Sequence, residues 1–265
     1  MVRPSYGGMT IFELNRYGCR AMSSSLLSNI GRAIFTVDDP HHDILRDDCF
    51  ADIVWAVWLC VPASLLWIAV PCNTWGYLNS SNTMRSKQRP SGNIKDPKVR
   101  AHNKLAKRIS KLLPLISLRR CYHVIENPTG SRLYDYRPMK LSLRDTLSRL
   151  ENIRLSSFGS LSAKPLWIHS SWPLIWRLVE WSDEMRKPNS RCKPLTKRDP
   201  KRSKNASADA TMLKLSLGYP VTFANIVGEM QASFLVKAQV ACFTKVIESP
   251  MLRYIIASYV AYTWY

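Results

Sequence analysis

The chain has few acidic residues for its length. Its 265 residues contain 19 Asp and Glu against 38 Lys and Arg, a formal net charge of +19, while 46% of the residues are apolar. This ordinary apolar content argues against general disorder. The length fits one large domain or two small ones. A charge surplus of this size predicts a polyanionic partner, either a nucleic acid or an anionic membrane surface.

Repeats and closely paired cysteines are also missing, and we expect no signal peptide. There is no Gly-X-Y repeat, no sustained heptad and no period of roughly 20–50 residues, which excludes collagen, coiled-coil and solenoid folds. The seven cysteines are irregularly spaced and form no Cys-x-x-Cys pair. We therefore expect reduced thiols in an intracellular compartment, nuclear or cytoplasmic, and neither a disulfide framework nor a metal site. Residues 1–10 lack the apolar core of a signal peptide.

The positive charge is concentrated in two segments. Arg85–Arg120 contains twelve Lys and Arg and one acid, and Arg186–Lys204 contains nine and one, so the rest of the chain is neutral. We expect a neutral body with two basic segments, through which a nucleic acid, DNA in the first instance, would bind. The alternatives are a solvated helix face for the first segment and a mobile arm for the second.

One uncharged stretch, Ile53–Cys72, has the length of a membrane span. Pro62 falls in its middle, where a helix would lose a hydrogen bond and clash with the preceding turn. We therefore expect a helix over 50–60, a turn over 61–64 and a buried strand over 65–70. A basic protein anchored by a span at 53–72 stays as an alternative.

Strands and helices alternate along the chain, which predicts an α/β fold with a parallel sheet and helices on both faces. Residues 73–97 have the pattern of a polar loop, and Pro114 is expected to end or kink the helix that precedes it. The remaining expected strands cover 9–14, 33–37, 121–125 and 166–169, and the remaining expected helices cover 21–29, 98–113, 174–181 and 223–245. Ligands of such sheets bind beyond the carboxyl ends of the strands.

Two motifs at expected strand ends resemble those of the cytosine-C5 DNA methyltransferases. Pro71-Cys72 follows one apolar run, and Glu126-Asn127-Pro128 follows a later one. The chain resembles in particular the divergent methyltransferase-like proteins encoded in algal, protist and viral mobile elements. The similar stretches, in the same order, are 70–86, 98–113, 126–139, 156–171 and 217–234. The resemblance implies a Rossmann-like sheet of the S-adenosylmethionine-dependent methyltransferases.

In that family the cysteine is the nucleophile and the glutamate holds the base. The resemblance therefore makes Cys72 the thiolate that adds to C6 of cytosine, which activates C5 toward a methyl donor. It makes Glu126 the acid that contacts N3 and the exocyclic amine. The target base would leave the stack to reach Cys72. The implied substrate contacts are Trp75, which would stack on a base, together with Asn127, Pro128, Arg85 and Arg132.

The implied cofactor is S-adenosylmethionine. Glu13 would lie beside its methionine part, Asp38 at its ribose hydroxyls and Asp43 near its adenine, with Pro71 also at the cofactor site. The segment 15–20 departs from the family pattern, because it offers one glycine where a glycine-rich turn lets backbone approach the ligand. A catalytically inactive, basic nucleic-acid-binding protein of the same fold is therefore the first alternative.

The sequence thus predicts a methyltransferase-like α/β core over 1–185 and a basic linker over 186–210. A helical segment over 211–245 would pack back on the core, and an apolar, aromatic tail of unassigned role covers 246–265. The expected activity is methyl transfer to cytosine C5 in DNA.

Overall fold

The computed structural model describes residues 11–15, 34–37, 43–160, 165–185, 196–197, 207–208, 220 and 222–234. For the strands β1 (Ile11–Asn15), β2 (Ile34–Val37), β7 (Thr196–Lys197) and β8 (Ser207–Ala208), only the backbone is described. The expected helix at 21–29, most of the expected linker at 186–210 and the tail at 246–265 lie outside these residues.

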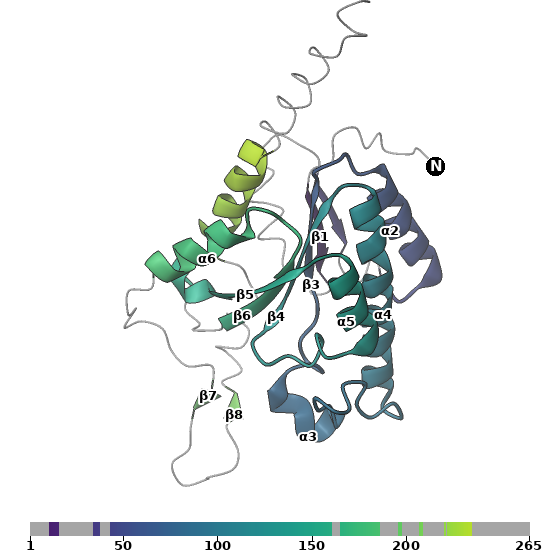
Figure 1. The fold of residues 1–265 in the computed structure, drawn as a ribbon. Helices are drawn as coiled ribbons and strands as arrows, with labels where there is room; N and C mark the ends of the chain where they lie inside the picture. Colours follow the sequence, from purple (N-terminus) through teal and green to yellow (C-terminus); the bar gives the residue numbers. More distant parts are fainter. Residues whose placement is uncertain are drawn as a thin grey trace, which may run out of the picture.

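A six-stranded mixed sheet forms the centre of the molecule (Figure 1). Its order is β2-β1-β3-β4-β6-β5, and β2, β1, β3 and β4 run parallel. The bounds of the last four strands are β3 (Leu65–Ala69), β4 (Tyr122–Pro128), β5 (Arg149–Arg154) and β6 (Pro165–Ser170). The expected α/β class is confirmed.

The expectation of an all-parallel sheet is wrong at β6, which runs antiparallel to both β4 and β5. Only the ten residues 155–164 connect β5 to β6, and four of them form the short helix η2 (Leu155–Phe158). A parallel crossover needs about a dozen residues or more, usually with a full helix. The short connection therefore turns the chain back on itself.

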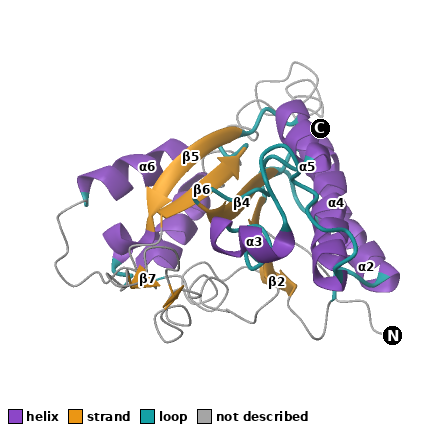
Figure 2. Cartoon of the chain, turned by 90° about the horizontal axis from the view of Figure 1, so that it is seen from below, coloured by secondary structure: helices purple, strands orange, loops and turns teal. Residues whose placement is uncertain are grey.

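Helices cover both faces of the sheet, as expected (Figure 2). The helices α2 (Asp47–Leu59), α4 (Pro97–Leu118) and α5 (Arg137–Asp145) pack on one face, where their apolar side chains meet Leu66 and Ile68 of β3. The helix α6 (Ile175–Glu184) and the helical residues 222–234 pack on the other face, against Leu65 and Trp67. Both sides of β3 are buried, which explains its continuous apolar sequence.

Pro114 does not end α4, so that half of the expectation is wrong. The helix continues to Leu118, with Pro114 inside it. A proline leaves the carbonyl four residues earlier without its helical donor. That carbonyl belongs to Ser110, and the hydroxyl of Ser142 in α5 donates a hydrogen bond to it at 2.6 Å. The neighbouring helix thus replaces the missing bond.

The segment 73–97 is more ordered than the expected loop. It contains the short helices η1 (Tyr77–Asn79) and α3 (Ser80–Thr83). The structure also adds α5 and β5, which were not expected. The expected helix over 223–245 is helical through residue 234, and residues 235–245 lie outside the described ranges.

The stretch 53–72 does not form a membrane span. It is divided between α2, a turn at Pro62 and Ala63, and the central strand β3. Ala63 has a φ of 66°, which reverses the chain direction sharply. Among the helices of the described part, none combines the length and apolar character that crossing a bilayer requires. The alternative of an anchor at 53–72 is therefore wrong.

Candidate functional site

Cys72 lies just after β3, and Glu126 lies near the end of β4, at the same edge of the sheet. The strands β3 and β4 are adjacent and parallel, and Ala69, the last residue of β3, is directly opposite Glu126. Cys72 follows three residues beyond Ala69. Glu126 is buried at 9% exposure and Cys72 is half-buried. The topology thus brings the two predicted catalytic residues to neighbouring positions at the carboxyl edge.

Asn127 connects the two strand ends. Its Nδ2 donates to the carbonyl oxygen of Val70 at 2.7 Å, just before Pro71 and Cys72. The side chain is fully buried, and its Oδ1 has no hydrogen-bond partner within the described part of the chain. Asn127 therefore holds the segment that carries Cys72 against the end of β4. Both prolines of the predicted site, Pro71 and Pro128, lie at these strand ends, and Pro71 is buried.

The chain turns sharply after Cys72. Its carbonyl oxygen accepts hydrogen bonds from the backbone N–H groups of Trp75 at 3.0 Å and Gly76 at 2.9 Å. Trp75 is fully buried, with the guanidinium of Arg85 3.5 Å from its ring centroid and the ring of Tyr136 at 5.5 Å. With its surface already covered, Trp75 is not available to stack on a base, so its burial argues against that predicted role.

Arg85 is buried and holds the segment after Cys72 through hydrogen bonds of its side chain. It is 3% exposed, and its guanidinium donates to the carbonyl of Pro90 at 2.5 Å and to Oδ1 of Asn103 at 2.9 Å. Burial lowers its pKa to about 10, so the group remains charged at neutral pH. These contacts use Arg85 within the protein, which argues against a direct contact with substrate. A buried arginine was not distinguishable from its exposed neighbours in the sequence.

Arg132 is the accessible member of the predicted arginine pair. Its guanidinium contacts the Asp135 carboxylate at 3.1 Å and is about one-third exposed. Its backbone N–H donates to the carbonyl oxygen of Trp75 at 2.9 Å, which places it beside the turn that follows Cys72. Of the two arginines, Arg132 is thus the one that a ligand at this edge can reach.

The predicted cofactor residues are only partly described. Glu13 lies on β1 with its backbone opposite Trp67 of β3, so it belongs to the strand next to the one that leads to Cys72. Asp38 lies outside the described residues. Asp43 accepts a hydrogen bond from the Leu45 N–H at 2.9 Å, which shapes the turn before α2. The described ranges contain no group of His, Cys, Asp or Glu side chains suited to a metal ion.

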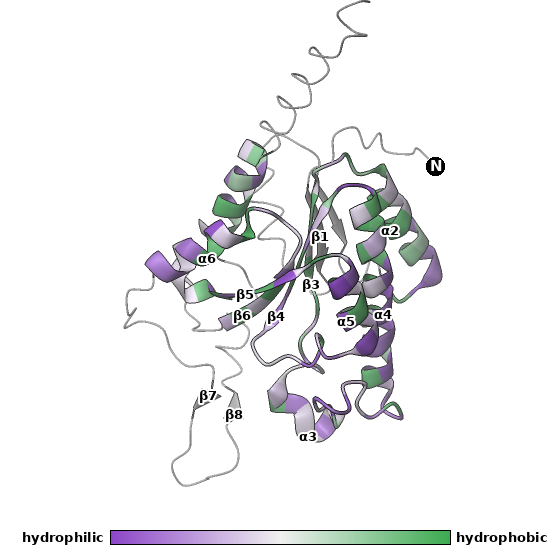
Figure 3. Cartoon of the chain, in the orientation of Figure 1, coloured by the Kyte–Doolittle hydropathy of each residue, from purple (hydrophilic) through white to green (hydrophobic). Residues whose placement is uncertain are grey.

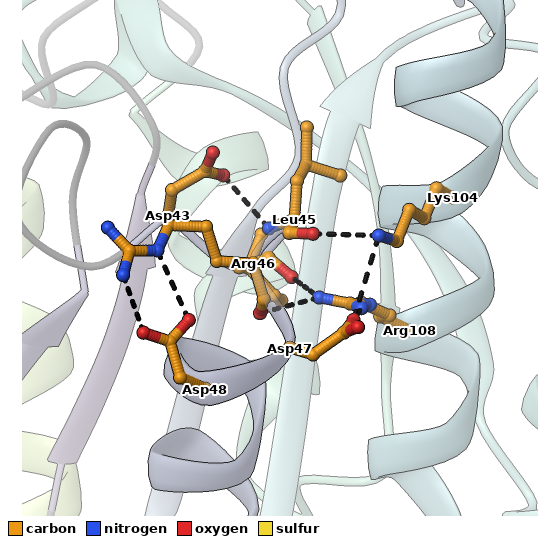
Figure 4. A network of polar contacts seen from close by, with 8 residues as sticks. Asp43, Leu45, Arg46, Asp47, Asp48, Lys104 and Arg108 are labelled. Atoms are coloured by element: carbon orange, nitrogen blue, oxygen red, sulfur yellow. Dashed lines mark hydrogen bonds and ion pairs between the residues drawn. The ribbon is translucent and has the colours of Figure 1, made fainter.

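Part of the first basic segment has a structural role. Figure 4 shows Lys104 and Arg108 of α4 reaching the chain before α2. Lys104 donates to the carbonyl of Leu45 at 2.8 Å, and Arg108 donates to that of Arg46 at 2.7 Å and contacts Asp47. These contacts fasten α2 to α4. The charge count of the sequence therefore overstates the basic surface that a partner meets.

The exposed bases from Lys87 to Arg100 lie toward the edge where Cys72 lies, whereas Lys107, Lys111 and Arg120 lie farther along the chain, away from that edge. Because α4 starts at the carboxyl edge and ends at the opposite one, its first residues and the preceding loop lie on the side of Cys72. Figure 3 shows hydrophilic stretches along the lower part of α4 and along α5. The exposed bases of the first segment are Lys87, Arg89, Lys95, Lys98, Arg100, Lys104, Lys107, Lys111 and Arg120, and α5 adds Arg137, Lys140 and Arg144.

Large apolar side chains also stand out from the segment after Cys72. Tyr77 is 59% exposed, and Leu78, Met84 and Ile94 are exposed to similar extents. The sequence pattern predicted a polar loop for this segment and did not single them out. The only signal was the Tyr77-Leu78 pair and single apolar residues at Met84 and Ile94 within an otherwise polar stretch. Together with the bases of the same segment, they form a surface that is both cationic and apolar.

Comparison with known proteins adds no family: no protein-family model matches the chain, and no curated protein is significantly similar to it.

Proposed function

We propose that the chain transfers a methyl group from S-adenosylmethionine to C5 of cytosine in DNA. The observation that carries the proposal is the pairing of β3 with β4, in which Ala69 lies opposite Glu126 and Cys72 follows at the same edge. Nucleophilic chemistry on a base needs a thiol and a base-holding acid together. The sheet order, with an antiparallel strand beside the last parallel one, also resembles that of S-adenosylmethionine-dependent methyltransferases.

In the proposed reaction, the Cys72 thiolate forms a bond to C6 of cytosine, and electron density moves to C5. Glu126 holds N3 and the exocyclic amine and supports the charge that enters the ring. S-adenosylmethionine, when bound, supplies the methyl group as an electrophile, and S-adenosylhomocysteine leaves. Loss of the C5 proton then breaks the bond between Sγ and C6, which regenerates the thiolate.

The proposed cofactor site lies at the carboxyl edge of the parallel strands. β1 lies between β2 and β3, so its carboxyl end opens on the same edge as Cys72. Ligands of open α/β sheets bind at this edge. Glu13 and Asp38 would receive the methionine part and the ribose hydroxyls, and Asp43 and Pro71 would border the adenine side.

The electrostatics favour an anionic partner at the edge. The helices α2, α4 and α5 each follow a parallel strand, so their N-termini all point to it, and helix N-termini carry partial positive charge. The exposed bases Lys87, Arg89 and Lys95 belong to the same side. DNA would bring phosphate to these groups and a base to Cys72.

The test uses purified protein, labelled S-adenosylmethionine and duplex DNA. We expect label in 5-methylcytosine with the wild type, none with Cys72→Ser, and at least a hundredfold less with Glu126→Gln. Cys49→Ser, a thiol change in α2, is the matched control and should keep the activity. DNA containing 5-fluorocytosine should trap the protein covalently through Cys72, because the C5 substituent cannot leave as a proton.

Transfer that persists in Cys72→Ser would exclude Cys72 as the nucleophile. If the folded wild type neither transfers label nor is trapped, the enzymatic proposal fails. Salt-dependent binding of the same DNA would then favour the second candidate, a non-enzymatic nucleic-acid-binding protein, for which the exposed bases are the supporting observation.

A further inference from the structure

Two buried thiols lie at the end of the sheet opposite the candidate site. Cys60 ends α2, and Cys121 directly precedes β4. Both come before parallel strands, whereas Cys72 comes after one. Cys60 is fully buried, and Cys121 is 4% exposed.

The turns that carry these cysteines are fastened to each other. The Ala63 N–H donates to the carbonyl of Arg120 at 2.8 Å, and the Tyr122 N–H donates to that of Ser64 at 2.8 Å. These two bonds flank Cys121 and keep it beside the turn that begins at Cys60. The relative position of the two cysteines is thus fixed by backbone contacts on both sides.

The thiols themselves are in contact. The Sγ of Cys121 donates to the carbonyl oxygen of Val61 at 3.3 Å, one residue after Cys60. The Sγ of Cys60 donates to the carbonyl oxygen of Ala56 at 3.4 Å, and the two thiols are close enough to interact with each other. The two thiols are therefore neighbours, which is the first requirement for a disulfide.

The surroundings favour the thiolate on Cys121. The hydrogen bond from Cys60 lowers the pKa of the Cys121 thiol, and the guanidinium of Arg119 acts in the same direction. The pKa of Cys60 is raised by its hydrogen bond with Cys121 and by burial. Arg119 is held in place because it donates to the carbonyl oxygen of Cys60 at 3.2 Å. A pair in which one thiol is the more acidic is typical of reactive dithiols.

We propose that Cys60 and Cys121 form a reversible dithiol–disulfide pair that hydrogen peroxide oxidises. The Cys121 thiolate attacks one peroxide oxygen, so that an S–O bond forms, the O–O bond breaks and hydroxide leaves with a proton as water. The sulfur of Cys60 then attacks Cys121, the S–S bond forms, and the sulfenic oxygen leaves as a second water. Two thiols are oxidised and one peroxide is reduced; a small dithiol reverses the change.

The bond would enclose residues 61–120, the part of the chain that holds β3, Cys72 and all of α4. A crosslink restricts the unfolded chain more as the enclosed loop lengthens. We therefore expect oxidation to raise the melting temperature, by on the order of 10 °C for a loop of this length. The proposal does not depend on methyl transfer, and its test needs no enzymatic activity.

The experiment treats the full folded chain with millimolar hydrogen peroxide, blocks the remaining thiols with iodoacetamide and digests without reductant. Mass spectrometry should find a peptide pair joined through Cys60 and Cys121, and dithiothreitol should abolish it. The melting temperature should rise on oxidation and return on reduction. Because both thiols are buried, the rate should follow local opening of the two turns and increase in mild urea.

Variants separate this pair from the other cysteines. In Cys60→Ser, a sulfenic acid should accumulate on Cys121, detectable with dimedone, and the thermal shift should vanish. Cys49→Ser, which removes another buried thiol, should leave both the crosslink and the shift unchanged. The proposal is overturned if the folded wild type shows no link between Cys60 and Cys121, if either links preferentially to another cysteine, or if the link forms only after unfolding.

Discussion

The hydroxyl of Ser142 in α5 donates a hydrogen bond to the carbonyl oxygen of Ser110 in α4, at 2.6 Å. Pro114 leaves this carbonyl without its helical donor, so a side chain from the neighbouring helix completes the backbone bonding. The bond also joins α4 and α5, two of the three helices that cover this face of the sheet.

Ser142→Ala should therefore destabilise the protein by about 1–3 kcal/mol, the cost of a buried acceptor left without a donor. Urea unfolding measures the change. Combining it with Pro114→Ala restores the backbone N–H to Ser110, so the loss caused by Ser142→Ala should shrink in that background. Ser117→Ala, on an exposed position of α4, serves as the control and should change little. Equal losses in both backgrounds would show that the bond does not compensate for the proline.

Gly92 is required in the segment that follows Cys72. It has a φ of +66°, and an added Cβ would lie 2.6 Å from the carbonyl oxygen of Thr83 and 2.7 Å from Cγ of Arg85. Gly92→Ala should cost roughly 3 kcal/mol, because backbone strain and a steric clash add. Gly159→Ala is the comparison, since Gly159 has a φ of +91° with no atom near its Cβ position. It should cost about 1 kcal/mol from strain alone, and a similar loss for both would exclude the clash.

His123 predicts a dependence of stability on pH. It is fully buried in β4, and its ring nitrogens contact the hydroxyls of Ser148 at 2.5 Å and Ser171 at 3.1 Å. Burial, with a smaller contribution from the charge of His169, lowers its pKa from 6.5 to about 4. The unfolded chain thus binds a proton at a higher pH than the folded one. Stability should be full above pH 6.5, fall as the pH drops toward 4 and level off below.

For a shift of this size the loss approaches roughly 3 kcal/mol. The measurement is the free energy of unfolding between pH 7.5 and 4, with reversibility checked at each pH. His123→Gln should reduce the slope, although His169, whose pKa burial also lowers to about 4, keeps part of it. An unchanged slope in His123→Gln would contradict the assignment.

The exposed bases near Cys72 should carry the salt dependence of DNA binding. Replacing Lys87, Arg89 and Lys95 by Gln should weaken binding at low salt and reduce the slope of log K against log salt by about 0.9 for each phosphate that these bases neutralise. The control replaces Lys107 and Lys111, which are also exposed but lie farther along α4, and the two effects are compared per charge removed. Lys111 is about 16 Å beyond Arg100 at 1.5 Å per residue. Binding titrations by fluorescence anisotropy at several salt concentrations measure both. Equal effects would mean that the bases act only through net charge.

The apolar pattern of the sequence was sufficient for the parallel part of the fold. The strands β1 to β4 and the helices α2 and α4 occur where continuous apolar runs and helical periodicity predicted them. Buried positions on a strand or helix require apolar residues, so burial produces these sequence patterns. The pattern failed for β5, whose sequence Arg149–Arg154 is mostly polar and exposed at the edge of the sheet. It also failed for α5, a short polar helix whose buried face is only a few residues wide.

The candidate site was likewise predictable from the sequence only in part. The sequence alone placed Cys72 and Glu126 after successive buried strands, and parallel strands put such residues at one edge as a matter of geometry. Only the tertiary structure decided that Trp75 and Arg85 are buried against each other, that Lys104 and Arg108 hold α2, and that Cys60 meets Cys121. Those contacts join segments far apart in the chain, and a side chain's partners across such separations depend on packing, which local sequence patterns do not encode.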